Sequence, residues 1–154
     1  MKTAYFALLL LVVGCTSFET RTYDVSLKNM SVNPVTIWIT KNGPAWEAGW
    51  KSPEDLAIES PGADERIPGV VVPSGKTAAI NKHTGRFAPN VSAILRVYAG
   101  QQGINELLAM SHRGPDRVDV VLQPGANNLV AVDEGGGIKV NRMELQTGTT
   151  DEHR

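Results

Sequence analysis

Apolar side chains alternate with polar ones along much of this chain, and this period of two is the feature that most restricts its fold. It is clearest in TYDVSLK at 22–28, where Tyr23, Val25 and Leu27 alternate with polar residues, and in PVTIWIT at 34–40. Because successive side chains of a β-strand point to opposite faces, each run predicts a strand with one apolar face. The link between them, NMSVNP, holds the turn formers Asn and Pro, so we expect these runs to pair as antiparallel strands.

Further apolar runs continue this pattern downstream. They are KTAAIN at 76–81, VSAILRVYAG at 91–100, RVDVVLQ at 117–123, LVAVD at 129–133 and IKVNRMEL at 138–145. Links rich in glycine and proline separate most of them, and short strands at intervals of about 10 residues are typical of a β-sandwich or barrel. The run INELLAMS at 104–111 fits either a strand or a helix.

We therefore predict an all-β fold, a single antiparallel β-sandwich of immunoglobulin-like or prealbumin-like type, over residues 22–146. A chain of 154 residues suits one such domain, and its composition is that of a globular protein. The polar residues 147–154 form a tail. The side chains expected to share one interior are those of Ile37, Ile39, Leu95, Val97, Val120, Leu122, Val130 and Val132.

One long segment, Lys41 to Gly69, interrupts the succession of strands and contains four prolines and four glycines. Within it, Ser52 is a good helix N-cap, Pro53 suits the first helical position, and two acidic residues follow near the positive end of the helix. We expect a short helix over 53–59. A long connection in a compact domain is usually functional or disordered, so this insertion is the first place to look for a site.

Trp46, Glu47 and Trp50 are the candidate ligand-binding residues of this insertion. Two tryptophans with a carboxylate between them could form an aromatic platform for a sugar ring or a peptide. Alternatively, the tryptophans pin the loop onto the sandwich. The second interpretation is the simpler one, and within it we expect Trp50 to be the buried tryptophan because it directly precedes the short helix.

The chain shows no recognisable catalytic or metal-binding pattern, so we expect no enzyme activity, no metal and no cofactor. His83, His112 and His153 lack metal-ligand spacing and are expected to be isolated surface residues. Ser74 lies in a turn, and no G-x-S-x-G motif is present. The formal net charge of −1 argues against a nucleic-acid partner, which would require a basic surface.

The N-terminus carries Lys2 followed by an uncharged apolar segment over 4–14, which is too short to span a bilayer and is typical of a signal peptide. It ends in Val12-Val13-Gly14-Cys15, which resembles the lipobox of bacterial lipoproteins. The resemblance implies that residues 1–14 are a signal peptide, that a diacylglycerol is attached to the Cys15 thiol, and that residues 15–21 are a lipidated tether. Cys15 is the only cysteine, so no internal disulfide forms.

The same resemblance sets the expected location and function. In enteric bacteria, an aspartate directly after the lipidated cysteine resembles an inner-membrane retention signal. This chain has Thr16 at that position, which favours the outer membrane, facing the periplasm. We expect an envelope lipoprotein, held at the membrane by its lipid, with a non-enzymatic binding or structural domain that meets an envelope protein or a glycan. The alternative is a carbohydrate-active or hydrolytic enzyme with its site near Trp46 and Trp50.

A second resemblance concerns the domain itself. The stretch KNMSVNPVTIWITKNG, followed later by VVPSGKTAAINKHTGRF, resembles the von Hippel–Lindau-type β domain, in which an Asn-x-Ser turn, a tryptophan-containing strand and a Pro-Gly turn recur in this order. Here Ser74 separates Pro73 from Gly75, and the insertion divides the pattern. The resemblance adds support for a sandwich, and no binding residue is transferred from it.

Overall fold

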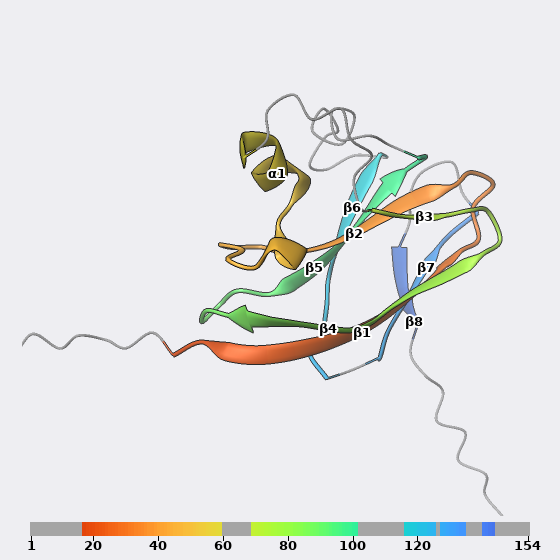
Figure 1. Ribbon diagram of the computed structural model, residues 1–154. Helices are drawn as coiled ribbons and strands as arrows, with labels where there is room; N and C mark the ends of the chain where they lie inside the picture. Colours follow the sequence, from red (N-terminus) through yellow and green to blue (C-terminus); the bar gives the residue numbers. More distant parts are fainter. Residues whose placement is uncertain (1–16, 60–68, 102–115, 126, 135–139, 144–154) are drawn as a thin grey trace, which may run out of the picture.

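Two four-stranded sheets face each other in the computed structural model (Figure 1). The model describes residues 17–59, 69–101, 116–125, 127–134 and 140–143. The first sheet has the order β4-β1-β7-β8 and the second the order β3-β2-β5-β6. The strands are β1 (Glu19–Asn29), β2 (Val35–Lys41), β3 (Val70–Val72), β4 (Thr77–Phe87), β5 (Ala93–Ala99), β6 (Arg117–Val121), β7 (Asn127–Val132) and β8 (Val140–Met143). The predicted β-sandwich is therefore confirmed.

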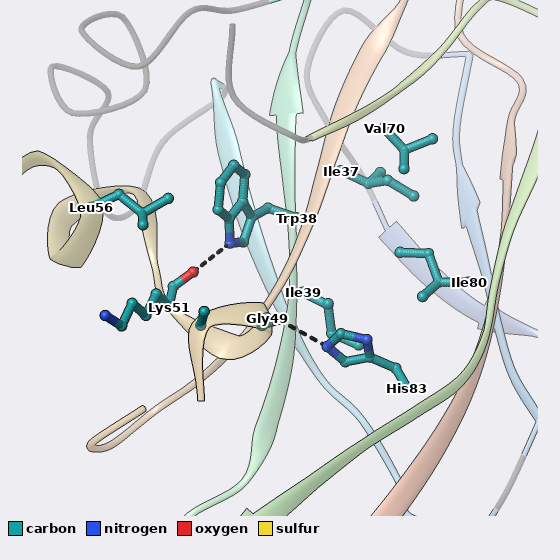
Figure 2. Close-up of a pocket in the computed structure, with 10 residues that line it drawn as sticks. Ile37, Trp38, Ile39, Gly49, Lys51, Leu56, Val70, Ile80 and His83 are labelled. Carbon is teal, nitrogen blue, oxygen red and sulfur yellow. Dashed lines mark hydrogen bonds between the residues drawn. The ribbon is translucent and has the colours of Figure 1, made fainter. Parts of the chain in front are cut away.

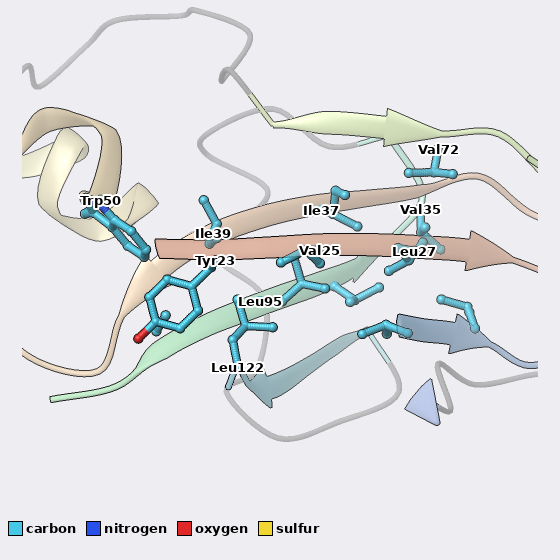
Figure 3. Close-up of a cluster of buried hydrophobic side chains, with 14 of the residues drawn as sticks. Tyr23, Val25, Leu27, Val35, Ile37, Ile39, Trp50, Val72, Leu95 and Leu122 are labelled. Carbon is cyan, nitrogen blue, oxygen red and sulfur yellow. The ribbon is translucent and has the colours of Figure 1, made fainter. Parts of the chain in front are cut away.

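The core lies between the sheets and is built by the alternating residues of the strands (Figure 3). Tyr23, Val25 and Leu27 are almost fully buried, whereas Thr22 and Lys28 on the opposite face are exposed. Of the eight side chains predicted to share one interior, seven belong to this core. The eighth, that of Val120, is partly buried and packs against it.

Strand pairing differs from the prediction in two respects. β1 and β2 do not form a hairpin, because they belong to opposite sheets, and β1 pairs in parallel with β7. Asn29 explains the first difference. Its buried side-chain amide donates to the carbonyl oxygens of Asn33 and Val72, while its Oδ1 accepts from the Ser31 N–H. These bonds satisfy the polar backbone where the chain crosses from the first sheet to the second.

β4 continues well beyond the expected strand at 76–81, as far as Phe87, and it contains a β-bulge. Tyr23 pairs with His83 and Val25 pairs with Ile80, so two steps along β1 correspond to three along β4. Lys82 adopts a positive φ of 54° within the bulge, and its N–H donates to the Asp24 carboxylate at 2.8 Å. The extra residue breaks the alternation of side chains and turns Ile80 and His83 toward the same side.

The segment after β2 contains the predicted helix, α1 (Pro53–Glu59), preceded by a 3₁₀ turn that was not predicted, η1 (Ala48–Trp50). Ser52 and Asp55 form a reciprocal cap. The Ser52 Oγ accepts from the Asp55 N–H at 3.1 Å, and the Asp55 carboxylate accepts from the Ser52 N–H at 2.8 Å. Leu56 packs against Trp38 on the outer face of the second sheet, so β2 is buried on both faces.

The N-terminal boundary of the domain also differs from the prediction. β1 begins at Glu19 and pairs with β4 from that residue onward, so the last three residues of the expected tether at 15–21 belong to the sheet. Backbone pairing does not require apolar side chains. The start of β1 was therefore missed, because its first residues are polar and show no apolar alternation. β3 was not predicted at all.

Several sequence expectations lie outside the described residues. They concern the signal peptide and lipidated Cys15, the run at 104–111, and the tail at 147–154. Within the described ranges, no helix is both long and apolar enough to cross a bilayer.

Candidate functional site

The insertion after β2 places Trp50 between the edges of the two sheets. Trp50 is 1% exposed, and its ring makes edge contacts with Tyr23 and Phe87 at centroid distances of 5.7 and 5.0 Å. Its Nε1 donates to the carbonyl oxygen of Thr84 in β4 at 3.0 Å, while its own carbonyl oxygen accepts from the Thr40 hydroxyl in β2 at 2.8 Å. Trp50 thus closes one side of the sandwich, as the simpler interpretation of this residue expected.

Glu47 forms a clasp with Lys41 beside this aromatic cluster. The Lys41 side chain is fully buried, and its ammonium donates to Glu47 Oε2 at 2.6 Å and to the Arg86 carbonyl oxygen at 2.7 Å. Glu47 Oε1 accepts from the Arg86 N–H at 2.8 Å. The ammonium also lies 4.5 Å from the centre of the Phe87 ring. Because the Lys41 ammonium holds its carboxylate, the pKa of Glu47 is lowered.

Trp46 is open to solvent and is not packed into the aromatic cluster around Trp50. It is 56% exposed, and its ring stands edge-on to Phe18, with 4.9 Å between ring centroids. The structure therefore does not bring the three predicted site residues together. Trp50 is in the core, Glu47 is partly exposed and joins β2 to β4, and Trp46 is the most exposed of the three, so Trp46 and Trp50 do not form a shared platform.

An open apolar pocket of about 370 Å³ lies on the side of the sandwich that the insertion after β2 covers (Figure 2). Its lining is Ile37, Trp38, Ile39, Ala48, Gly49, Lys51, Leu56, Val70, Ile80 and His83. The pocket exists because β3 is short. β3 pairs only with Val35–Ile37, so beyond Ile37 this edge of β2 borders η1 and the pocket instead of β3.

Two features of the local fold shape this pocket. The β4 bulge brings both Ile80 and His83 into its wall, although their spacing would place them on opposite faces of a regular strand. Gly69, just before β3, lies so close to β2 that an added Cβ would stand 2.9 Å from the Thr36 methyl group. A glycine there lets the chain approach β2 immediately before Val70, which lines the pocket.

The indole and imidazole N–H groups that line the pocket are bonded within the protein. His83 Nε2 donates to the Gly49 carbonyl oxygen at 2.9 Å, and Trp38 Nε1 donates to the Lys51 carbonyl oxygen at 2.9 Å (Figure 2). Burial lowers the pKa of His83 from its ordinary value, and the Lys41 ammonium lowers it further. The neutral imidazole is therefore favoured, and the pocket presents a mostly apolar lining.

His83 corrects one expectation and illustrates what sequence reasoning missed. It is half-buried against Trp50, with 4.3 Å between ring centroids, and is not an isolated surface residue. His112 and His153 lie outside the described residues. Among the residues that are described, no three His, Cys, Asp or Glu side chains gather in a way that could hold a metal ion. The pocket itself was not predicted, because its residues come from four separate parts of the chain, namely β2, the insertion, β3 and β4.

An apolar hollow at a sheet edge, whose polar groups are already bonded, suits an apolar ligand group better than a charged one. No protein-family model, curated protein or solved structure matches the chain.

Proposed function

We propose that the chain is an envelope lipoprotein, anchored through a lipid on Cys15, whose β-sandwich is a non-enzymatic binding module. Its ligand is an apolar group presented by a neighbouring envelope protein. The observation that carries the binding role is the open pocket at the edge of β2, about 370 Å³ in volume. The anchor rests on the Val12-Val13-Gly14-Cys15 pattern, and the outer membrane is proposed from Thr16.

The composition of the pocket favours an apolar protein group over a glycan. Sugar rings need several free hydrogen-bonding groups around them in addition to an aromatic surface. Here the Trp38 indole N–H and the His83 imidazole N–H are bonded to backbone carbonyl oxygens, and isoleucine side chains cover much of the remaining wall. An aliphatic or aromatic side chain would bury apolar surface there without leaving polar groups unpaired.

The arrangement of Glu47 supports a non-enzymatic role. A general acid in a glycosidase has a raised pKa, so that it carries a proton to donate. The pKa of Glu47 is lowered instead, and both carboxylate oxygens accept hydrogen bonds that join β2 to β4. The alternative of a carbohydrate-active enzyme beside Trp46 and Trp50 therefore receives no support from its best-placed carboxylate.

The binding role is tested with Nile red, an uncharged apolar dye whose emission rises in apolar surroundings. We expect saturable dye binding by the wild-type protein and its loss in Ile80→Glu, which places a charge in the pocket wall. Ala79→Glu is the matched control. It adds the same charge to β4, but at a residue that is exposed on the other face of the strand. Binding that is absent in the wild type, or equal in both variants, would contradict the proposed site.

The anchor is tested separately in a bacterial host that processes lipoproteins. Wild-type protein is expected to take up a clickable fatty-acid label and to fractionate with membranes. Cys15→Ser removes the thiol, so it is expected to remain unlabelled and to keep its signal peptide. Equal labelling of wild type and Cys15→Ser would exclude Cys15 as the lipidation site, whatever the outcome of the dye experiment.

A further inference from the structure

One end of the sandwich carries an exposed pair of aromatic residues, Phe18 just before β1 and Trp46 in the insertion after β2. Phe18 is 41% exposed and Trp46 is 56% exposed, and their rings meet edge to face. The guanidinium of Arg86 lies 5.2 Å from the centre of the Phe18 ring. Two large aromatic side chains in contact, both open to solvent and accompanied by a cation, form a surface that packing within the domain does not explain.

The neighbouring loops at this end carry no charged residue. They are NGPAW at 42–46 and APNVS at 88–92. Asn42 and Ser92 join them, since the Asn42 N–H donates to the Ser92 carbonyl oxygen at 3.0 Å and the Ser92 N–H donates to Asn42 Oδ1 at 2.7 Å. Trp46 therefore projects from a pair of uncharged loops that hydrogen bonds hold together, and the charged groups beside them, Glu19 and Arg21, are paired with each other.

The sequence places this pair very close to Cys15. Three residue steps separate Cys15 from Phe18, so their α-carbons are at most about 11 Å apart. The headgroup region on each side of a bilayer is roughly 5–8 Å thick. If Cys15 carries acyl chains buried in the hydrocarbon, Phe18 has to lie within or just outside the headgroup region.

We propose that Phe18, Trp46 and Arg86 form a seat that inserts into the headgroup region of the phospholipid bilayer to which the chain is anchored. The proposal rests on the lipidation of Cys15 proposed above. Tryptophan is enriched at this depth because its ring is both apolar and polar, and arginine is attracted to anionic lipid headgroups. The seat would add an orienting contact to the lipid anchor, so that β1 and β4 extend away from the membrane.

The seat is tested with the lipidated full-length chain reconstituted into phosphatidylcholine vesicles, some of which contain brominated acyl chains that quench nearby tryptophan. Trp38 and Trp50 are 7% and 1% exposed, so they contribute a background that the Trp46→Phe variant measures. We expect brominated lipid to quench the difference in emission between wild type and Trp46→Phe. Fatty-acid labelling of both proteins verifies that the anchor is present.

A second variant tests whether Trp46 contacts the bilayer by its own affinity or only because the short tether from Cys15 holds it there. It carries ten Gly/Ser residues inserted between Ser17 and Phe18, which lengthens the tether while leaving the domain unchanged. Quenching of Trp46 that persists in this variant supports the seat, because the tether no longer requires contact. Labelled protein whose quenching disappears with the longer tether would overturn it.

The remaining outcomes also decide the matter. A labelled wild-type chain without Trp46 quenching would overturn the seat and leave the anchor intact. An unlabelled wild-type chain would overturn the anchor and the seat together. Trp46 that is unquenched by brominated lipid, yet cross-links efficiently to residue 46 of a second copy, would assign the aromatic pair to self-association instead.

Discussion

The indole ring of Trp50 lies directly against the backbone of Gly85 in β4, with no room for a side chain between them. A Cβ on residue 85 would stand 2.7 Å from the Trp50 Cε2 and would also overlap Nε1, the atom that donates to Thr84. Glycine at this position is therefore what allows the insertion after β2 to close the side of the sandwich.

Gly85→Ala is expected to destabilise the domain by about 1–3 kcal/mol, because Trp50 would have to move within a packed core. Urea unfolding followed by circular dichroism measures the change. Gly49→Ala is the matched control, since a Cβ there would meet only the His83 Cε1 at an ordinary 3.6 Å. Equal stability of the two variants would show that Trp50 does not pack as described.

The two tryptophans of the insertion are expected to respond in opposite ways to truncation. Trp50→Ala removes a buried ring from the core and is expected to cost about 3–5 kcal/mol. Trp46→Ala is expected to change stability by no more than about 0.5 kcal/mol, because Trp46 is exposed. The same unfolding assay measures both, and a large loss from Trp46→Ala would contradict its described position.

Lys41 and Glu47 are expected to show strong coupling. Glu47→Gln leaves the fully buried Lys41 ammonium without its carboxylate and is expected to cost about 2–3 kcal/mol. Adding Lys41→Met removes the buried charge and should restore part of that loss. A double-mutant cycle measures the coupling, and additivity within about 0.5 kcal/mol would argue against the clasp.

His83 is expected to make stability depend on pH. Its pKa is lowered in the folded state, so the unfolded chain binds the proton more readily. The stabilising contribution is therefore fully present above a pH of about 6.5 and is lost as the pH falls through the lower folded pKa. Unfolding midpoints measured across this range should fall less steeply in His83→Gln, and parallel curves for the two proteins would refute the assignment.

Local sequence patterns predicted the elements of this fold better than their pairing. Alternation located β1 and β2, a continuous apolar run located β5, and Ser52 with Pro53 marked the start of α1, because these signals depend only on neighbouring residues. The parallel pairing of β1 with β7 joins segments about a hundred residues apart, and no turn motif encodes it. The β4 bulge escaped notice because Lys82 in a positive-φ conformation leaves no distinctive local pattern.

The candidate site was predicted in part. The insertion named from the sequence supplies part of the pocket wall, and Trp50 is buried as expected. A lysine such as Lys41 ordinarily indicates solvent exposure, so its burial beneath aromatic rings could not be inferred without the partners that β4 supplies. The pocket depends on where β3 ends relative to β2, which is a property of the assembled sheets.

The central position of β1 in its sheet has a mechanical consequence. β1 is hydrogen-bonded along one side to β4 and along the other to β7. A pull applied at residue 17 acts along the strand, across the direction of those hydrogen bonds, and loads both ladders in shear. Many bonds must then yield together, whereas a strand peeled from an edge releases them one at a time. Tension that arrives along β1 from the N-terminus is thus shared between two strands.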